Sequence, residues 1–379
     1  MEWKYSKLKN LNLDSFVPSF TAESRPNHDQ LAELASRLTG ATYNIVLLNG
    51  ILDPTLSTLD VLPKELTVKK SEKKFEDKYP DRFTDAHGSL SGQGLQIELA
   101  ESSSLPRPVK IVFFNSQATD GRPLLIQPKI FIKVGSRSKL SVVTESWGPR
   151  GQEYFVNSRL EIDVKDSGNL EFVQTSEESE KSFHLTRYNY KIGLNSQVTS
   201  LFQYLESGTA RLEVSVPVNH AHIDHRFYAM GLLKNKNQVD IQTEILHNSG
   251  ESSTKQICKF IADDESRAIF GGKVVIAKNA QKTNIEQLNQ NLLLSSKAEI
   301  DSEPQLEIDA DDVKASHGST IGSLDPEEVF YLQSRAIPKK TALKILSFGF
   351  LNEVIQQLEN ETLKSTAENS LRKYLQGGI

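Results

Sequence analysis

Residues 130–146 read IFIKVGSRSKLSVVTES and residues 160–176 read LEIDVKDSGNLEFVQTS, so two similar segments follow one another at an offset of 30 residues. Apolar and polar residues alternate in both, as in strands with one buried face; the apolar positions include Ile130, Ile132 and Val134, then Leu160, Ile162 and Val164. A looser third copy starts near residues 190–192. Units repeated at a fixed period indicate a stacked array in which each unit buries its apolar face against its neighbours.

We expect this array to be a β-helix or β-solenoid, because strand patterns follow one another from about residue 90 to residue 320 without helical periods between them. A β-sandwich of hairpins is the alternative that two clear copies leave open. Upstream, residues 43–48 are predicted to form a buried strand, and Asn27 or Asp29 is predicted to cap a short helix.

The pattern becomes helical after Gly322. Asp325-Pro326-Glu327-Glu328 is typical of a helix start, with a capping aspartate, proline at the first position and acids in the first turn. Ile337-Pro338 is predicted to end that helix, and two amphipathic helices are predicted to follow. The chain is therefore expected to be mainly β, with three regions: a mixed and helical region at 1–88, the β core at 89–322, and a helical domain at 323–379.

The composition excludes several classes of protein. The net charge of −5 in 379 residues lacks the basic excess expected of a protein that binds nucleic acid or anionic membranes. The apolar runs are far shorter than the about 18 residues needed to span a bilayer, and the first residues lack the apolar core of a signal peptide, so a cytoplasmic location is expected. A single cysteine, Cys258, excludes an internal disulfide and a cluster held by cysteines of one chain.

Two histidine-containing segments are candidates for metal chemistry. In residues 220–225, HAHIDH, a strand would place His220, His222 and Asp224 on one face, where they could bind a metal or simply form a polar outer surface. The second segment, residues 304–319, places His317 close to several aspartates, and its imidazole could bind a metal or make structural hydrogen bonds. Cys258 lies in a strand-like run, where a free cysteine is usually a small buried hydrophobe.

The region from residue 272 to residue 337 also carries a family resemblance. It reads GKVVIAKNAQKTNIEQLNQNLLLSSKAEIDSEPQLEIDADDVKASHGSTIGSLDPEEVFYLQSRAI. Its AQKT, PQLEI, ADDVKASHG and FYLQSR blocks resemble those of the SufD subunits of the SUF iron–sulfur cluster assembly system, in the SufB/SufD family. Weaker similarity covers nearly the whole chain, including MEWKYSKL at residues 1–8 and DIQTEILHNSGESSTKQ at residues 240–256.

The resemblance implies a right-handed parallel β-helix with helical regions at both ends. It further implies a non-enzymatic scaffold subunit of a SufBCD complex, in which SufB pairs with the end of the β-helix and the SufC ATPase docks on residues 325–358. The candidate SufC contacts in that stretch are Phe330, Leu332, Arg335, Leu346 and Phe350. An open β-helix end also invites pairing between two copies, and the sequence leaves the oligomeric state of the isolated chain undecided.

His317 matches the functional histidine of the family's SHG motif, which implies that it helps to hold iron or a nascent cluster at the SufB contact. No cofactor is then expected to stay bound to this chain alone, and the sequence does not decide whether a flavin binds. Ala315 stands where many relatives have cysteine, so partner thiolates must supply most ligands. Glu2 and Trp3 stand at the very start of the chain, so helices that usually precede this element are expected to be missing, by truncation or by nature.

An alternative from another class is a β-helix enzyme that acts on polysaccharides. Asp309, Asp311 and Asp312 would then be its acidic or Ca²⁺-binding groups. That function predicts carboxylates and aromatic sugar platforms in one outward groove. A plain β-repeat adaptor without iron chemistry is a third alternative.

Overall fold

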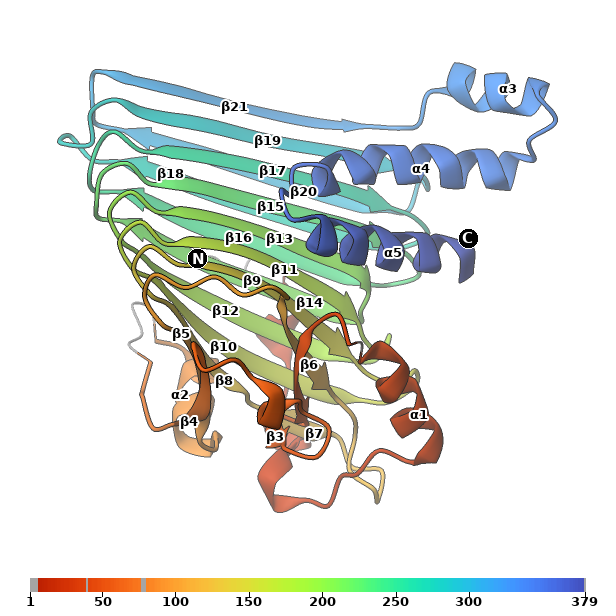
Figure 1. The fold of residues 1–379 in the computed structure, drawn as a ribbon. Helices are drawn as coiled ribbons and strands as arrows, with labels where there is room; N and C mark the ends of the chain where they lie inside the picture. The colour runs from red at the N-terminus through yellow and green to blue at the C-terminus, as the bar shows by residue number, and fades with distance from the viewer. Residues whose placement is uncertain (1–5, 39, 76–79, 378–379) are drawn as a thin grey trace.

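The computed structural model describes residues 6–38, 40–75 and 80–377, and its main feature is two long sheets that share one wound chain (Figure 1). Sheet A follows the order β20-β18-β16-β14-β12-β10-β8-β5-β4, and sheet B follows β21-β19-β17-β15-β13-β11-β9-β6-β2-β3. The chain alternates between the sheets, and consecutive strands within each sheet pair in parallel from β5 to β20 and from β2 to β21. The fold is therefore a parallel β-helix, as predicted, and not a sandwich of hairpins.

The strands of the middle coils are about ten residues long and closely matched in length. Sheet A contains β4 (Leu66–Ser71), β5 (Gly94–Leu99), β8 (Lys129–Val134), β10 (Tyr154–Val164), β12 (Phe183–Ile192), β14 (Thr209–Val218), β16 (Gln238–His247), β18 (Arg267–Ile276) and β20 (Glu299–Ile308), with β1 (Val17–Pro18) and β7 (Leu124–Ile126) attached beside β10. Sheet B contains β2 (Tyr43–Leu48), β3 (Ile51–Asp53), β6 (Val109–Phe114), β9 (Lys139–Trp147), β11 (Asn169–Glu177), β13 (Gln197–Glu206), β15 (Asp224–Leu233), β17 (Ser253–Ala262), β19 (Thr283–Leu293) and β21 (Val313–Gly322).

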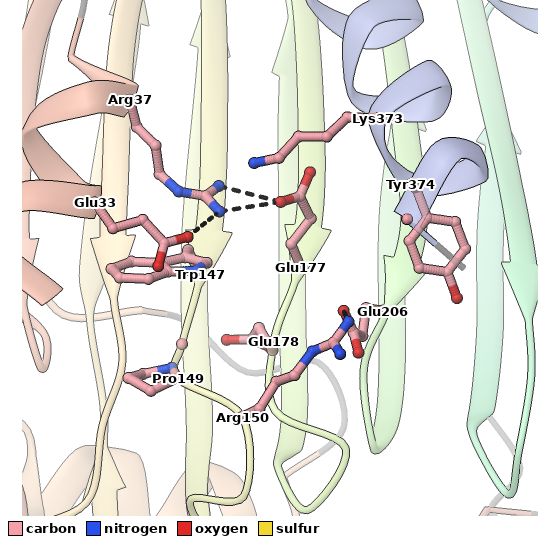
Figure 2. A pocket seen from close by; sticks show the side chains of 12 residues that line it. Glu33, Arg37, Trp147, Pro149, Arg150, Glu177, Glu178, Glu206, Lys373 and Tyr374 are labelled. Carbon is pink, nitrogen blue, oxygen red and sulfur yellow. Dashed lines mark hydrogen bonds and ion pairs between the residues drawn. The ribbon is translucent and has the colours of Figure 1, made fainter. Parts of the chain in front are cut away.

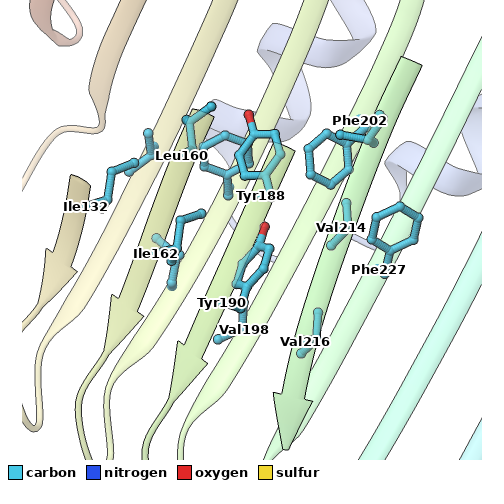
Figure 3. Close-up of a cluster of buried hydrophobic side chains, with 14 of the residues drawn as sticks. Ile132, Leu160, Ile162, Tyr188, Tyr190, Val198, Phe202, Val214, Val216 and Phe227 are labelled. Carbon is cyan, nitrogen blue, oxygen red and sulfur yellow. The ribbon is translucent and has the colours of Figure 1, made fainter. Parts of the chain in front are cut away.

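The repeat seen in the sequence is the register of neighbouring coils. Ile130 pairs with Leu160 in sheet A, and Leu140 pairs with Leu170 in sheet B, so the offset of 30 residues is one coil. The third copy is also confirmed, because Leu160 pairs with Tyr188 on the next coil. Apolar side chains from both sheets meet in a continuous buried core, which Figure 3 shows for the middle coils.

Each coil passes from sheet A to sheet B through a corner residue with a left-handed backbone conformation. The φ angles at these corners lie between 54° and 58°, at Ser102, Arg137, Ser167, Asn195, His222, Glu251 and Lys282. The corner N–H groups donate to carbonyls of the next coil, for example Arg137 to Asp166 at 3.0 Å and Ser167 to Leu194 at 2.8 Å. The corners therefore form a hydrogen-bonded stack that continues the sheet ladders around the bend.

Helices lie outside the wound core. At the N-terminal side these are α1 (His28–Arg37) and α2 (Arg82–Leu90), with short 3₁₀ turns η1 (Lys7–Asn10), η2 (Leu13–Ser15), η3 (Ser19–Thr21) and η4 (Leu59–Val61). Asn27 caps α1 through a reciprocal pair of hydrogen bonds with Gln30, as the sequence predicts for Asn27. At the C-terminal side α3 (Pro326–Ser334), α4 (Lys339–Ile355) and α5 (Glu361–Gly377) match the three predicted helices. Asp325 caps α3 by accepting from the Glu327 N–H at 2.8 Å.

One local prediction is wrong. His220 and His222 are not on a strand with Asp224, because they lie in the corner before β15, which begins at Asp224. His222 has a φ of 57°, so the alternation of faces that a strand would impose does not apply there. Its imidazole faces Glu251 of the next corner at 3.4 Å, and both side chains are exposed to solvent. The boundaries at residues 88 and 322 stay predictions, and residues 1–5 of the MEWKYSKL element lie outside the described residues.

Two histidines are buried inside the core without full hydrogen bonding. Both ring nitrogens of His225 lack a partner, and Nε2 of His247 meets the Thr254 hydroxyl at 3.0 Å. Burial, with a further contribution from His247, lowers the pKa of His225 to about 3, and burial lowers the pKa of His247 to about 4. Unfolding would return both to an ordinary value of about 6.5. As the pH is lowered, both histidines therefore take up protons at a higher pH in the unfolded state than in the folded state. The free energy of unfolding consequently falls as the pH drops from about 6.5 towards 4.

We predict that His225→Phe reduces this acid sensitivity. The substitution removes no hydrogen bond, since neither ring nitrogen has a partner, and it removes one group that must stay neutral. Urea unfolding at about pH 7 and about pH 5 should show a smaller loss of stability for the variant, by on the order of 1–3 kcal/mol. The control is His28→Gln, whose side chain is 97% exposed and which should behave as the parent. Equal acid sensitivity of His225→Phe and the parent would contradict the prediction.

Candidate functional site

The last coil of the β-helix is open. Strands β20 and β21 are the terminal strands of sheets A and B, and no described residue forms a strand beyond them. Inward-facing side chains of this coil consequently meet solvent, and Ile308 is 42% exposed and Ile321 is 48% exposed. Exposed ladder edges and an uncovered apolar interior together favour pairing with another chain. We call this end, formed by β20 and β21, the open mouth.

His317 lies in the open mouth. It is on β21, in register with Gln287 on β19, which in turn is in register with Gln256 on β17. The amide of Gln287 donates to the Gln256 side chain at 2.7 Å and to the Gly272 carbonyl at 3.1 Å, inside the core. Parallel in-register residues share a face, so His317 continues this inward row and is exposed only because no further coil covers it.

Ala315 and Ser316 have different surroundings although they are adjacent. Ala315 faces inward, as His317 does, and packs against the core. Ser316 faces the opposite side of the strand, because adjacent side chains of a strand point to opposite faces, so it cannot act together with His317. A cysteine at position 315 would have shared the inward face with His317. Of positions 315 and 317, only His317 therefore has a side chain that could bind a metal.

The aspartates near His317 do not complete a metal site. Asp311 and Asp312 lie in the corner between β20 and β21, and the Asp312 carbonyl accepts from the Lys282 N–H at 2.6 Å. Within the described ranges, no group of three or more His, Cys, Asp or Glu side chains is arranged to hold a metal ion. A metal held at His317 would need its other ligands from a second molecule.

Cys258 is remote from this chemistry. Its side chain is fully buried in the core, and burial raises the pKa of the thiol well above its usual value. A neutral, enclosed thiol is a poor metal ligand and nucleophile. The structure thus places Cys258 as a core residue and does not bring it to the surface with His317.

The candidate SufC contacts fall into two groups on α3 and α4. Phe330 is 72% exposed and Arg335 is exposed, with the Arg335 guanidinium 4.9 Å from the ring centre of Tyr331. Leu332 and Leu346 are half-buried. Helix α3 projects away from the β-helix beyond the end of α4 (Figure 1). Phe330 and Arg335 are therefore accessible without any rearrangement.

Phe350 has a different role from Phe330. It packs against the apolar cluster between the helices and the outer face of sheet B, and the Lys259 ammonium lies 4.5 Å from the centre of its ring. Lys259 also forms an ion pair with Glu353 on α4. A change at Phe350 would therefore disturb the attachment of the helices as well as any docking surface.

Buried polar contacts fix this helical platform, α4 and α5, on sheet B. The Glu171 carboxylate on β11 accepts from the Glu359 N–H at 2.6 Å and from the Asn360 N–H at 2.9 Å, in the turn between α4 and α5. Asn360 caps α5 by accepting from the Thr362 N–H at 2.9 Å. The Gln203 amide on β13 donates to the Ala367 carbonyl at 3.0 Å. The platform thus depends on the middle coils and not on the last one.

The structure contains a second polar site that was not predicted from the sequence. A cleft of about 350 Å³ lies between α1, the ends of β9, β11 and β13, and α5 (Figure 2). Arg37 reaches across it, 4.8 Å from the Trp147 ring centre, and pairs with Glu145, with Glu33 at 3.1 Å and with Glu177 at 3.2 Å. Burial alone would lower the pKa of Arg37, but these carboxylates outweigh burial and raise that pKa.

This cleft fastens α1 to the β-helix. Lys110 and Arg37 hold the pKa of buried Glu145 below its usual value, against the effect of burial, so this carboxylate stays ionised and pairs with both cations. Acidic residues at the ends of successive strands (Glu145, Glu177 and Glu206) are the sequence signal that could have indicated the cleft. Its cations and carboxylates are mostly satisfied by each other, which is the arrangement of a structural ion-pair network.

The wound core, the open mouth and the helical platform agree with a known family. The family model described as SUF system FeS cluster assembly, SufBD core domain, matches residues 114–350. This chain belongs to the SufBD family. Among curated relatives, a SufBD family protein of Synechocystis is 28% identical over 96% of this chain and 84% of its own length, and SufD of Escherichia coli is 26% identical over 99% and 88%. SufD of Bacillus subtilis is 41% identical over 32% of this chain and 28% of its own length.

For this SufBD protein we predict that Glu171→Ala loosens the helical platform. The substitution leaves the N–H groups of Glu359 and Asn360 without their acceptor, which costs about 1–3 kcal/mol. Hydrogen exchange of the α5 amides should become faster while that of the core strands does not. The control, Glu286→Ala on β19, removes a carboxylate that is 51% exposed and should leave α5 unchanged. Unchanged protection of α5 in Glu171→Ala would show that the packing alone holds the helices.

Proposed function

We propose that the chain is a scaffold subunit for iron–sulfur cluster assembly, which pairs with SufB at the open mouth and binds the SufC ATPase through α3 and α4. The observation that carries this proposal is the uncovered last coil, where the inward row ends in the exposed side chain of His317, in a chain of the SufBD family. Named relatives are iron–sulfur cluster assembly proteins, which supports the assembly role.

SufB is the partner that the open mouth fits best. Two terminal strands of ten residues each present unpaired ladder edges. The inward apolar side chains of Ile308, on β20, and Ile321, on β21, are exposed to solvent there. A paralogue with the same wound core would offer a second mouth of the same width, so that its terminal coil could continue both ladders. Without SufB, a second copy of this chain would meet the same requirement.

Iron or a nascent cluster is the cargo at this contact and not a resident cofactor. His317 supplies one imidazole, and the enclosed Cys258 supplies nothing to the surface. Mixed histidine and cysteine ligation is known for iron–sulfur clusters, so thiolates from SufB would complete the site. A single ligand from this chain makes the cargo easy to release once the partner moves.

We predict that His317→Ala lowers the cluster yield of the assembled complex several-fold. The substitution removes the imidazole from an exposed position, so the fold and the pairing of the subunits should persist. The measurement is iron and sulfide content after anaerobic reconstitution of the co-purified complex with SufB and SufC. Ser316→Ala is the matched control, because Ser316 is the exposed neighbour on the opposite face. An unchanged yield in His317→Ala would exclude a ligand role.

We predict different effects for charges placed at Phe330 and at Phe350. Phe330→Glu should weaken SufC capture by at least about tenfold while changing the free energy of unfolding by less than about 0.5 kcal/mol, because the ring is 72% exposed. Phe350→Glu should destabilise the platform by about 1–3 kcal/mol, because its ring packs against the helix–sheet cluster. Pull-down with SufC and thermal unfolding of both variants test this. Unchanged SufC capture by Phe330→Glu would show that SufC does not bind at Phe330.

The polysaccharide-acting enzyme receives no support from a specific observation. Asp309, Asp311 and Asp312 lie at the edge of the open mouth, and the exposed aromatic side chains among the described residues, Phe20, Phe330 and Tyr331, lie on other elements.

No described helix is long and apolar enough to cross a membrane.

A further inference from the structure

The opposite end of the β-helix has a mouth of its own. Strand β3 ends sheet B and strand β4 ends sheet A, far from β20 and β21 (Figure 1). Between these strands lies a groove of about 480 Å³, whose floor is formed by the last core side chains, Leu47, Leu52 and Leu95. Its volume is within the usual range of about 300–1,000 Å³ for small-molecule sites. We call it the first-coil groove.

Apolar side chains from three separate segments surround the first-coil groove. Phe20 is 54% exposed, Ile51 is 55% exposed and Leu90 is 37% exposed, and they come from η3, β3 and the end of α2. Scattered exposed apolar residues are normal, but these three converge on one concave site. Covering them would bury apolar surface, which favours a ligand with an apolar body.

The charges of the groove have one sign. Lys70 and Lys129 are the charged residues that line it, and no acidic side chain does so in the part of the chain that the structure describes. Neither lysine forms an ion pair with a described residue, although the protein as a whole has a net charge of −5. The pKa of Lys129 is lowered first by burial and then by the nearby charges of Arg159 and Lys74. An anionic group would relieve this repulsion.

Lys70 is directed into the mouth by the register of its strand. It pairs with Leu95 across the antiparallel ladder of β4 and β5, and Leu95 belongs to the core. Opposite residues in such a pair share a face, so Lys70 occupies an inward position in line with Leu66 and Val68. An inward lysine on a terminal strand also protects that edge against strand addition. This protection accounts for Lys70 but not for Lys129 or the exposed apolar rim.

We propose that the first-coil groove binds an amphiphilic anion, with an unbranched acyl chain in the apolar trough and its carboxylate at Lys70 and Lys129. The groove volume of about 480 Å³ leaves room for one such chain. The lysine on β4 opposes an added peptide strand, so a small amphiphile fits better than an extended segment of a protein. This site is independent of the proposed role in cluster assembly.

Titration calorimetry of the full chain with decanoate tests the proposal. We expect saturable binding of one decanoate per chain, below the concentration at which it forms micelles. Butyrate lacks the apolar body and decyltrimethylammonium lacks the negative head, so each should bind at least about tenfold more weakly. Equal binding of decanoate and decyltrimethylammonium would overturn the role of the lysines. No binding of decanoate, with binding of an acidic apolar peptide, would assign the groove to a protein partner instead.

Variants distinguish a built site from general electrostatic attraction. Lys70→Glu with Lys129→Glu should weaken decanoate binding at least about tenfold. Lys64→Glu with Lys69→Glu changes the net charge equally on exposed residues that do not line the groove, and should bind as the parent does. Gly92→Leu should block the trough without a folding cost, because nothing lies within 4 Å of an added Cβ there. Equal losses in both double variants, or full binding by Gly92→Leu, would overturn the proposal.

Discussion

Every coil of a parallel β-helix must bury its inward row against the next coil, and this requirement governs the whole molecule. In the middle coils the inward rows stack on one another, as at Ile130, Leu160 and Tyr188, and neighbouring strands pair in parallel along most of their length. The requirement cannot be met at the two ends. Both ends therefore carry the exposed apolar side chains and the unpaired polar groups that give the protein something to bind.

The same requirement explains what the sequence predicts well. Alternation at 130–134 and 160–164 is visible because each inward residue must be apolar in both coils, and residues 43–48 read as a strand for the same reason. Capping by Asn27 and Asp325 is local and was predicted from the sequence. His220 and His222 were misplaced because a corner residue with φ of 57° has no sequence mark when it is not glycine.

The functional sites depend on contacts that a sequence pattern does not contain. His317 could be named from its motif, but its exposure follows from the absence of a further coil over β21. Phe330 and Phe350 look alike in the sequence, whereas the structure separates an accessible ring from one that fastens a helix. The Arg37 network joins residues more than 100 positions apart, so only the folded chain brings its charges together.

The attachment of the helical platform has a mechanical consequence. Its polar anchors are on the middle coils, at Glu171, Gln203 and Lys259, whereas α3 packs on α4 and lies between the end of β21 and the start of α4 (Figure 1). A molecule that pulls on α3 therefore loads the β-helix at two places, the middle coils through α4 and the last coil through residues 323–325. The strand that carries His317 is the one joined directly to α3, so the pull reaches the open mouth as a displacement of β21, which the ladder hydrogen bonds between β21 and β19 resist.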